Sequence, residues 1–144
     1  MANKRSIVLR GCPTVNEEGS ATEAIKPGYL VKGVTSIAKQ TGTGWVPRAL
    51  ALERDELGRG IDDTRQSYAG AAAYASGDKV KVGVFKSGDE AVCYVASGAN
   101  ITEDDYLESK GDGLLEEGTT TPIARAMETL GVVTTETALR VQFL

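Results

Sequence analysis

The sequence predicts an all-β (mainly β) fold, and three features support this prediction. In residues 77–113, apolar and polar residues alternate in short runs separated by turn residues, as in strands with one buried face. The chain has seventeen glycines and only four prolines, a composition that favours short strands and tight turns over a helix bundle. The last residues, 138–144, alternate again. Six to eight short strands at this spacing indicate a small β-barrel or sandwich.

The first 24 residues are predicted to form an extended N-terminal arm, and residues 25–144 one β domain. The arm has a single apolar run, Ile7-Val8-Leu9, followed by Gly11-Cys12-Pro13 and a polar stretch. Such a segment can lie over its own domain or reach a neighbouring subunit, and the sequence does not decide between these positions. Proteins usually cover or pair an apolar strand, so we expect the arm to serve assembly more than folding.

The first part of the predicted domain consists of turns and short extended pieces. Lys26-Pro27-Gly28 has the residues of a β-turn, with proline suited to the first corner and glycine to the second. The pieces expected after it are extended segments over 29–31, 33–46 (interrupted by Thr41-Gly42-Thr43-Gly44) and 48–53, an exposed charged loop over 55–66, and a small-residue segment over 69–75, either a helical turn or irregular.

A β-hairpin is predicted at the centre of the core. Val80, Val82 and Val84 alternate with lysine and glycine, residues 87–89 supply a turn, and residues 91–96 form a second apolar run. Two such runs joined by a short glycine-containing loop are typical of a hairpin. Phe85 breaks the alternation and is predicted to point outward, which makes it an interface candidate.

The remaining residues predict further short elements. In order, these are an element over 101–107, a turn at 110–113, a polar connection over 114–121, a strand within 122–130 and a final strand over 138–144. The segment 122–130 also has helical spacing, but Pro122 and the strand-rich context favour a strand. In the final strand Leu139, Val141 and Phe143 face one way.

Composition argues against several classes of function. The net charge is −4, from 16 basic and 20 acidic residues, whereas proteins that coat nucleic acid normally have a basic face. No apolar stretch approaches the roughly 18 residues of a membrane-spanning helix, and the apolar run near the N-terminus is too short for a signal peptide. We therefore expect a soluble protein made in the cytoplasm, with Cys12 and Cys93 as free thiols and Cys93 packed as a small hydrophobic residue.

No pattern predicts catalysis, a cofactor or a metal. The chain has no histidine, so nucleophile candidates such as Ser67, Ser97 and Cys93 lack the usual base. The acidic groups at 103–105 and 116–117 lack the spaced ligand set of a calcium loop and are interpreted as solvated charge. The glycines at 41–44 and 58–60 do not complete a phosphate-binding loop. The aromatic residues are scattered, and most of them are expected in the core or in an interface.

The order of several short motifs resembles the head decoration (cement) proteins of tailed bacteriophages. The resemblance covers most of the chain from about residue 25, and each motif consists mainly of turn residues. Where similar sequences often carry Gly-Asp before the Tyr/Phe-Leu pair, this chain has Asp104-Asp105 and so lacks a turn glycine. The motifs are, in order, Ile25-Lys26-Pro27-Gly28, Gly60-Ile61-Asp62-Asp63, YASGDKV at 74–80, Gly88-Asp89-Glu90, ASGANI at 96–101, DYLES at 105–109, Gly111-Asp112-Gly113, ARAME at 124–128 and Arg140-Val141.

The resemblance implies a structural virion protein with a β-tulip domain. Such a protein is made in the host cytoplasm, binds the outer surface of the expanded capsid, commonly as homotrimers, and stabilises it by bridging major capsid protein subunits without touching nucleic acid or membrane. Bridging requires complementary surface and avidity rather than catalysis, which agrees with the absence of catalytic motifs and cofactor sites from the sequence. The candidate capsid or trimer contacts are Ile7, Val8, Leu9, Arg59 and Phe85.

Two other classes of protein stay open. A receptor- or carbohydrate-binding β-domain of a phage fibre or spike would need an exposed aromatic cluster with polar neighbours, and none is apparent in the sequence. An acyl- or biotin-carrier domain carries a lysine in a hairpin turn, and Lys110 before Gly111-Asp112-Gly113 has that position. The residues that normally surround the carrier lysine are missing here.

Overall fold

The computed structural model describes residues 7–53 and 73–144, and within them it contains fourteen β-strands and no helix. The all-β class predicted from the sequence is confirmed. More strands form than the six to eight expected. Many of them are only two or three residues long, too short for an alternating pattern to reveal them. They are β1 (Val8–Arg10), β2 (Thr14–Asn16), β3 (Ser20–Ala21), β4 (Val31–Lys32), β5 (Ser36–Lys39), β6 (Ala49–Ala51), β7 (Val82–Val84), β8 (Glu90–Val95), β9 (Asn100–Ile101), β10 (Tyr106–Gly111), β11 (Leu114–Glu117), β12 (Ala124–Ala126), β13 (Gly131–Val132) and β14 (Thr137–Phe143).

Five strands form a closed circuit of hydrogen-bonded neighbours, which we call the ring. Its order is β8–β11–β10–β12–β14, and β14 pairs back to β8. β14 runs antiparallel along the whole of β8, from Thr137 opposite Val95 to Gln142 opposite Glu90. The other edge of β8 is shared, since β1 pairs with its first residues and β11 with Val95 at its end. Every residue of β8 is buried, so this strand lies at the centre of the molecule.

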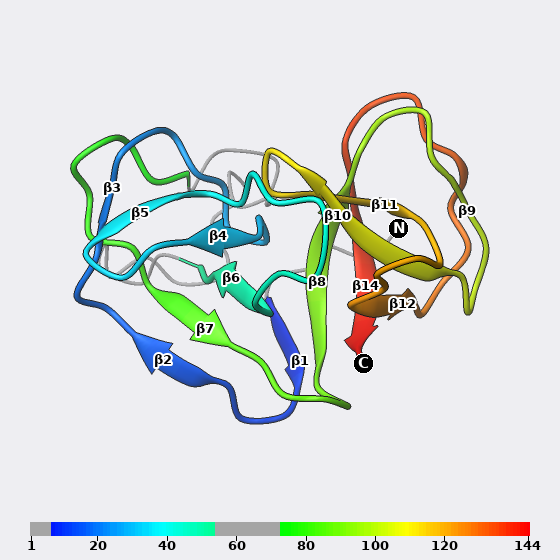
Figure 1. The fold of residues 1–144 in the computed structure, drawn as a ribbon, viewed down its shortest axis with the longest axis horizontal. Helices are drawn as coiled ribbons and strands as arrows, with labels where there is room; N and C mark the ends of the chain where they lie inside the picture. The colour runs from blue at the N-terminus through cyan, green and yellow to red at the C-terminus, as the bar shows by residue number, and fades with distance from the viewer. Residues whose placement is uncertain (1–6, 54–72) are drawn as a thin grey trace, which may run out of the picture.

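Six earlier strands form two small sheets, which we call the N-terminal lobe. One sheet has the order β2–β7–β6 and the other β3–β5–β4, and a bridge between Leu30 and Leu50 connects them. Figure 1 shows these strands on the left of the molecule and the ring on the right, with β1 beside β8 between the two regions. β9 pairs with β13 at the right-hand end.

The predicted central hairpin is wrong, although both of its strands exist. β7 lies between β2 and β6, so both of its edges are occupied and it cannot also pair with β8. Burial along the strand differs as well, because Val80 and Val82 are buried but Val84 is 44% exposed. Gly83, on the opposite face from Val84, packs against Leu52. The apolar runs at 80–84 and 91–96 therefore belong to different sheets, and β8 alone forms the centre of the core.

Residues 8–21, assigned to a separate arm from the sequence, are part of the folded body. β1 pairs with β8, β2 with β7, and β3 runs parallel to β5. Of the two positions that the sequence left open, the segment takes the one over its own domain. The boundary predicted at residue 24 does not separate two bodies, because strands from both sides of it share sheets.

Several local predictions agree with the structure, and two do not. The element expected over 101–107 is divided by a turn that separates β9 from β10. β12 lies within the segment 122–130, and Leu139, Val141 and Phe143 of β14 are all buried. Cys93 is buried, and both cysteines are free. The polar connection predicted over 114–121 instead begins with β11, which forms a hairpin with β10. The loop predicted over 55–66, Arg59, and residues 69–72 of the small-residue segment lie outside the described residues.

Candidate functional site

The contact residues predicted from the sequence differ in how exposed their side chains are. Ile7 is fully buried, and its backbone N–H donates to a carboxylate oxygen of Glu53 at 3.0 Å. Val8 is half-buried and packs against the core, whereas Leu9 is 39% exposed. A fully buried side chain cannot contact a partner without unfolding, so of this run Leu9 is the residue best placed to contact one.

The prediction that Phe85 points outward is wrong. Phe85 is only 2% exposed, and its ring packs on Phe143 with centroids 5.2 Å apart and planes inclined by 31°. The alternation fails after Val84 because β7 ends there, and the next side chain turns into the core. An aromatic pair of this kind stabilises the fold, and Phe85 is a packing residue.

An apolar surface lies next to this aromatic pair, where the loop before β6 meets the ends of β7 and β14. A depression of about 490 Å³ is lined there by Trp45, Pro47 and Val84, together with Pro122, Ile123 and Leu144. Trp45 is 71% exposed and Val84 44% exposed. Arg48 supplies the polar wall of this depression, and its Nε donates to the backbone carbonyl of Phe85 at 3.1 Å.

A second depression of about 300 Å³ continues from the first between the two sheets of the N-terminal lobe. Pro47 and Val84 line both, and the second adds Val31 of β4, Ile37 of β5 and Val82 of β7. Val34, at its rim, is 65% exposed. We call the two depressions together the apolar groove. Scattered exposed apolar residues are normal, but a continuous apolar surface of this kind is typical of an interaction site.

Trp45 is not among the contact residues predicted from the sequence. A signal is present, because the glycine- and threonine-rich run at 41–44 precedes it and Pro47 follows it. Such residues favour a loop, and a loop lies at the surface. A large aromatic side chain in a polar, glycine-rich loop is therefore a better interface candidate than one within an apolar run.

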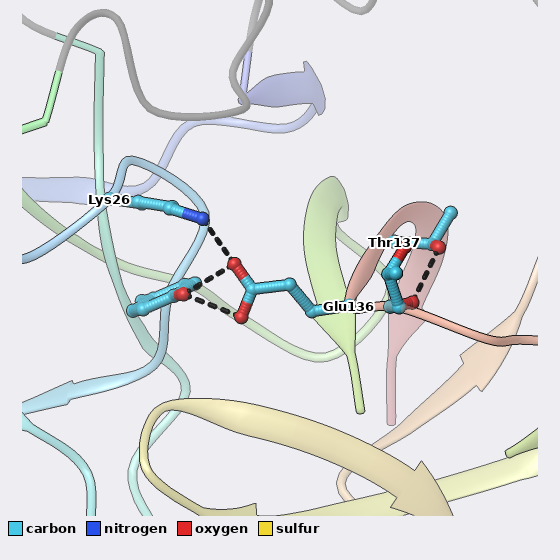
Figure 2. A network of polar contacts seen from close by, with 5 residues as sticks. Lys26, Glu136 and Thr137 are labelled. Atoms are coloured by element: carbon cyan, nitrogen blue, oxygen red, sulfur yellow. Dashed lines mark hydrogen bonds and ion pairs between the residues drawn. The ribbon is translucent and has the colours of Figure 1, made fainter. Parts of the chain in front are cut away.

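A polar cluster joins the N-terminal lobe to the ring. Figure 2 shows Lys26, from the turn before β4, pointing at Glu136, which precedes β14. The Lys26 ammonium forms an ion pair with the Glu136 carboxylate, and the Tyr29 hydroxyl lies 2.7 Å from each carboxylate oxygen. The Lys26 Nζ is 5.8 Å from the centre of the Tyr29 ring, and that ring meets Tyr94 of β8 edge to face at 5.5 Å.

This arrangement shifts the pKa values of Glu136, Tyr29 and Tyr94. Burial by itself raises the pKa of Glu136, but hydrogen bonds from Lys26 and Tyr29 and the charges of Lys26 and Lys39 outweigh it, so the pKa lies below its ordinary value. Burial and the neighbouring Glu136 charge raise the pKa of Tyr94 to about 12. Burial, the hydrogen bond to Glu136 and the Glu136 charge raise the pKa of Tyr29. Both tyrosines are therefore neutral at pH 7, and the cluster acts as a structural link between the two regions.

The remaining chemically interesting groups are few. Burial raises the pKa of the Cys93 thiol, which keeps it protonated. Among residues 7–53 and 73–144, no group of three or more carboxylate or cysteine side chains has an arrangement suited to a metal ion. The same residues include no helix long and apolar enough to cross a membrane. Lys110 is exposed at the end of β10.

A scan against protein-family models finds no match to this chain, and a search of curated proteins finds none either.

Proposed function

We propose that the protein is a structural component of a tailed-phage virion that binds the outer surface of the expanded capsid. In this role it stabilises the shell by bridging major capsid protein subunits, acting as a trimer and without catalysis. The observation that carries the proposal is the ordered set of turn motifs between residues 25 and 141. The fold is compatible with it, since a rigid β-protein can present a fixed surface to two neighbours at once.

The motifs coincide with positions where the backbone requires their residue types. Gly28 and Gly98 have φ angles of 98° and 91°, a region that side chains other than glycine rarely adopt. Asp104, which occupies the place of a glycine in the similar sequences, has a φ of 74°. A glycine would suit the backbone conformation of this turn better than aspartate does.

The apolar groove and Leu9 give the proposal a physical basis in surface contacts. Large exposed apolar groups such as Trp45, at 71% exposure, favour burial against another protein. Trp45 and Tyr106 are both exposed, but no ring contact joins them in the part of the chain that the structure describes. A cluster of exposed aromatic residues would favour the alternative function, a receptor- or carbohydrate-binding domain of a fibre or spike.

Binding to purified phage heads tests the proposal. Recombinant protein is mixed with expanded, genome-free heads and with unexpanded proheads, and the bound fraction is measured after sedimentation of the heads. We expect binding to expanded heads and little binding to proheads, with added resistance of the decorated heads to heat. Binding to neither form would overturn the proposed function, and equal binding to both would overturn the dependence on expansion.

A matched pair of variants tests the part of Leu9 in this binding. Leu9→Asp places a charge on the exposed part of β1, and Thr35→Asp adds the same charge in the exposed loop between β4 and β5. We expect Leu9→Asp to weaken head binding by about tenfold or more, as truncation of an interface anchor does, and Thr35→Asp to leave it unchanged. Equal effects of the two variants would mean that Leu9 is not at the interface.

A further inference from the structure

Charge is distributed unevenly between the two regions of the molecule. Residues 90–144, which form the ring with β9 and β13, contain ten Asp and Glu residues and three Lys and Arg residues, a net charge of −7. The described residues before them, 7–53 and 73–89, contain six acidic and eight basic residues, a net charge of +2. A molecule with such opposite regions attracts a second copy of itself in a head-to-tail orientation.

The apolar groove lies mainly in the basic region, and Pro122, Ile123 and Leu144 of the acidic region complete one wall. Lys32 and Arg48 line the groove, and no side-chain carboxylate is among its lining residues. Arg48 is half-buried and already donates to the main-chain oxygens of Phe85 and Leu144, so the exposed Lys32 is the cation more accessible to a partner. Lys32 is exposed and donates to the hydroxyl of Thr41 at 2.6 Å, which positions its ammonium beside the loop that carries Trp45. The groove therefore suits an apolar group accompanied by negative charge.

The opposite end of the molecule presents such a group. Val132 of β13 is 70% exposed, and it pairs with Asn100 of β9, whose N–H donates to the carboxylate of Glu117 at 2.9 Å. Glu103 and Asp104, in the turn that follows β9, are exposed, and the Glu103 N–H donates to Thr129 in the segment before β13. The Asp104 carboxylate is paired with Arg125 at 3.0 Å, so we call Val132 with the carboxylates of Glu103 and Glu117 the acidic tip. It lies at the end that β9 marks in Figure 1.

We propose that the apolar groove of one copy binds the acidic tip of a second copy. Val132 enters the apolar groove beside Trp45, and the carboxylates of the tip face Lys32 and Arg48. Because the two surfaces are different, the contact is heterologous, and repetition of it closes a ring of subunits when the rotation allows. The contact would supply the subunit interface of the proposed trimer, and in that respect it rests on the proposed function.

The sole tryptophan of the chain provides a direct probe of this contact. Trp45 is exposed in the single copy, so its emission should shift to shorter wavelength as the protein concentration rises and the groove fills. Sedimentation velocity on the same samples measures the accompanying increase in mass. Raising the salt concentration to about 0.5 M screens the charges and should weaken the association. A protein that stays monomeric with unchanged emission at millimolar concentration and low salt would overturn the inference.

Two variants that each remove one surface test the head-to-tail geometry. Trp45→Ala removes the anchor of the groove, and Val132→Asp removes the apolar group of the tip; both residues are exposed, so both variants should fold. Each variant alone should associate about tenfold or more weakly than the wild type. An equimolar mixture should form a dimer, because the tip of Trp45→Ala and the groove of Val132→Asp are intact. A mixture that stays monomeric contradicts the heterologous contact. Association of Val132→Asp alone at the wild-type level also contradicts it and indicates groove-to-groove association.

Ser76→Asp is the matched control, since it adds the same charge to an exposed residue that belongs to neither surface. It should associate like the wild type. These measurements use no phage heads, so they can fail separately from the proposed function. If the protein is monomeric but binds expanded heads, the self-contact is wrong and the head-binding function stands. If it forms oligomers but binds no heads, the self-contact stands and the head-binding function is wrong. Burial of Trp45 only when heads are added would assign the groove to the capsid and overturn the self-contact.

Discussion

The ring and the N-terminal lobe use the same kind of secondary structure but differ in how completely it is paired. β8 and β14 share six consecutive residue pairs, and the ring closes on itself. The strands of the N-terminal lobe are two to four residues long and form two separate sheets. As a result the lobe leaves Val15, Val34 and Val84 substantially exposed, whereas every residue of β8 is buried.

This difference indicates a division of labour between the two regions. Long, fully paired strands bury apolar surface and supply most of the stability of a β-protein. Short strands with open faces supply little stability but expose the apolar groups that a partner can cover. We therefore expect substitutions in the ring to affect folding, and equivalent substitutions at the open faces of the lobe to affect association.

The largest effect is expected from a charge placed inside the ring. Val92 of β8 is fully buried, so Val92→Asp puts an unpaired carboxylate in the core at a cost of several kcal/mol, comparable with the whole stability of about 5–15 kcal/mol of a typical domain. Val84→Asp, on the open face of β7, should cost about 1 kcal/mol or less. Thermal unfolding of the two variants measures the contrast. Equal destabilisation would show that the two regions contribute alike.

The next effect concerns the segment that the sequence assigned to an arm. Ile7 is fully buried and Leu9 is 39% exposed. Ile7→Ala should cost about 2–4 kcal/mol through lost packing, whereas Leu9→Ala should cost about 0.5 kcal/mol or less. Deletion of residues 1–20 should unfold the protein, contrary to the expectation from the sequence, because it removes Ile7, β1 and β2. A deletion variant with native circular dichroism and an unchanged melting temperature would show that residues 1–20 form an arm that the fold does not need.

Local pattern predicted which residues form strands better than it predicted their partners. The alternation in 138–144 gave β14 correctly, because one face of that strand is buried throughout. The same kind of alternation in 80–84 did not give a hairpin, because β7 pairs with β2 and β6, both distant in the sequence. Partner choice depends on contacts between remote segments, and a single sequence contains no local signal for it.

The candidate site illustrates the same limit. The buried Ile7 and Phe85 were predicted as contacts because apolar runs and broken alternation look alike whether a residue faces solvent or a second layer. Trp45 was not singled out, because its exposure depends on the loop at 41–48 lying over the ends of β7 and β14. The composition of that loop indicated a surface position, but the groove beside it is formed by residues from separate parts of the chain.

A smaller effect tests the link between the two regions. Because the pKa of Glu136 is lowered in the folded protein, the ionised carboxylate stabilises the fold above its unfolded pKa, and this contribution is lost as the pH falls through the lower folded value. Glu136→Gln should cost about 1 kcal/mol at pH 7, a figure reduced for partial exposure of the pair. The difference from wild type should vanish at a pH well below 4.5. A difference independent of pH in urea unfolding would contradict the assignment.

Tyr29→Phe is the matched control for this link. It removes only the hydroxyl that contacts Glu136 and keeps the ring that packs on Tyr94. We expect it to destabilise the fold by less than Glu136→Gln at pH 7, because the ion pair with Lys26 remains. A larger effect of Tyr29→Phe would place the stabilisation in the tyrosine contact instead of the ion pair.

The smallest effect is expected at Asp104, in the turn between β9 and β10. Its φ of 74° is unfavourable for a residue with a Cβ atom, and its carboxylate pairs with Arg125 at 3.0 Å on the surface. Asp104→Gly removes both the strain and the ion pair, whereas Asp104→Ala removes the ion pair and keeps the strain. An exposed ion pair contributes about 0–1 kcal/mol, so Asp104→Gly should lie close to wild type. Asp104→Ala should be less stable than Asp104→Gly by about 1 kcal/mol, the cost of a Cβ atom in the left-handed region. Equal free energies of unfolding for the two variants would show that the turn relaxes, and that the glycine of the similar sequences is not required by backbone geometry.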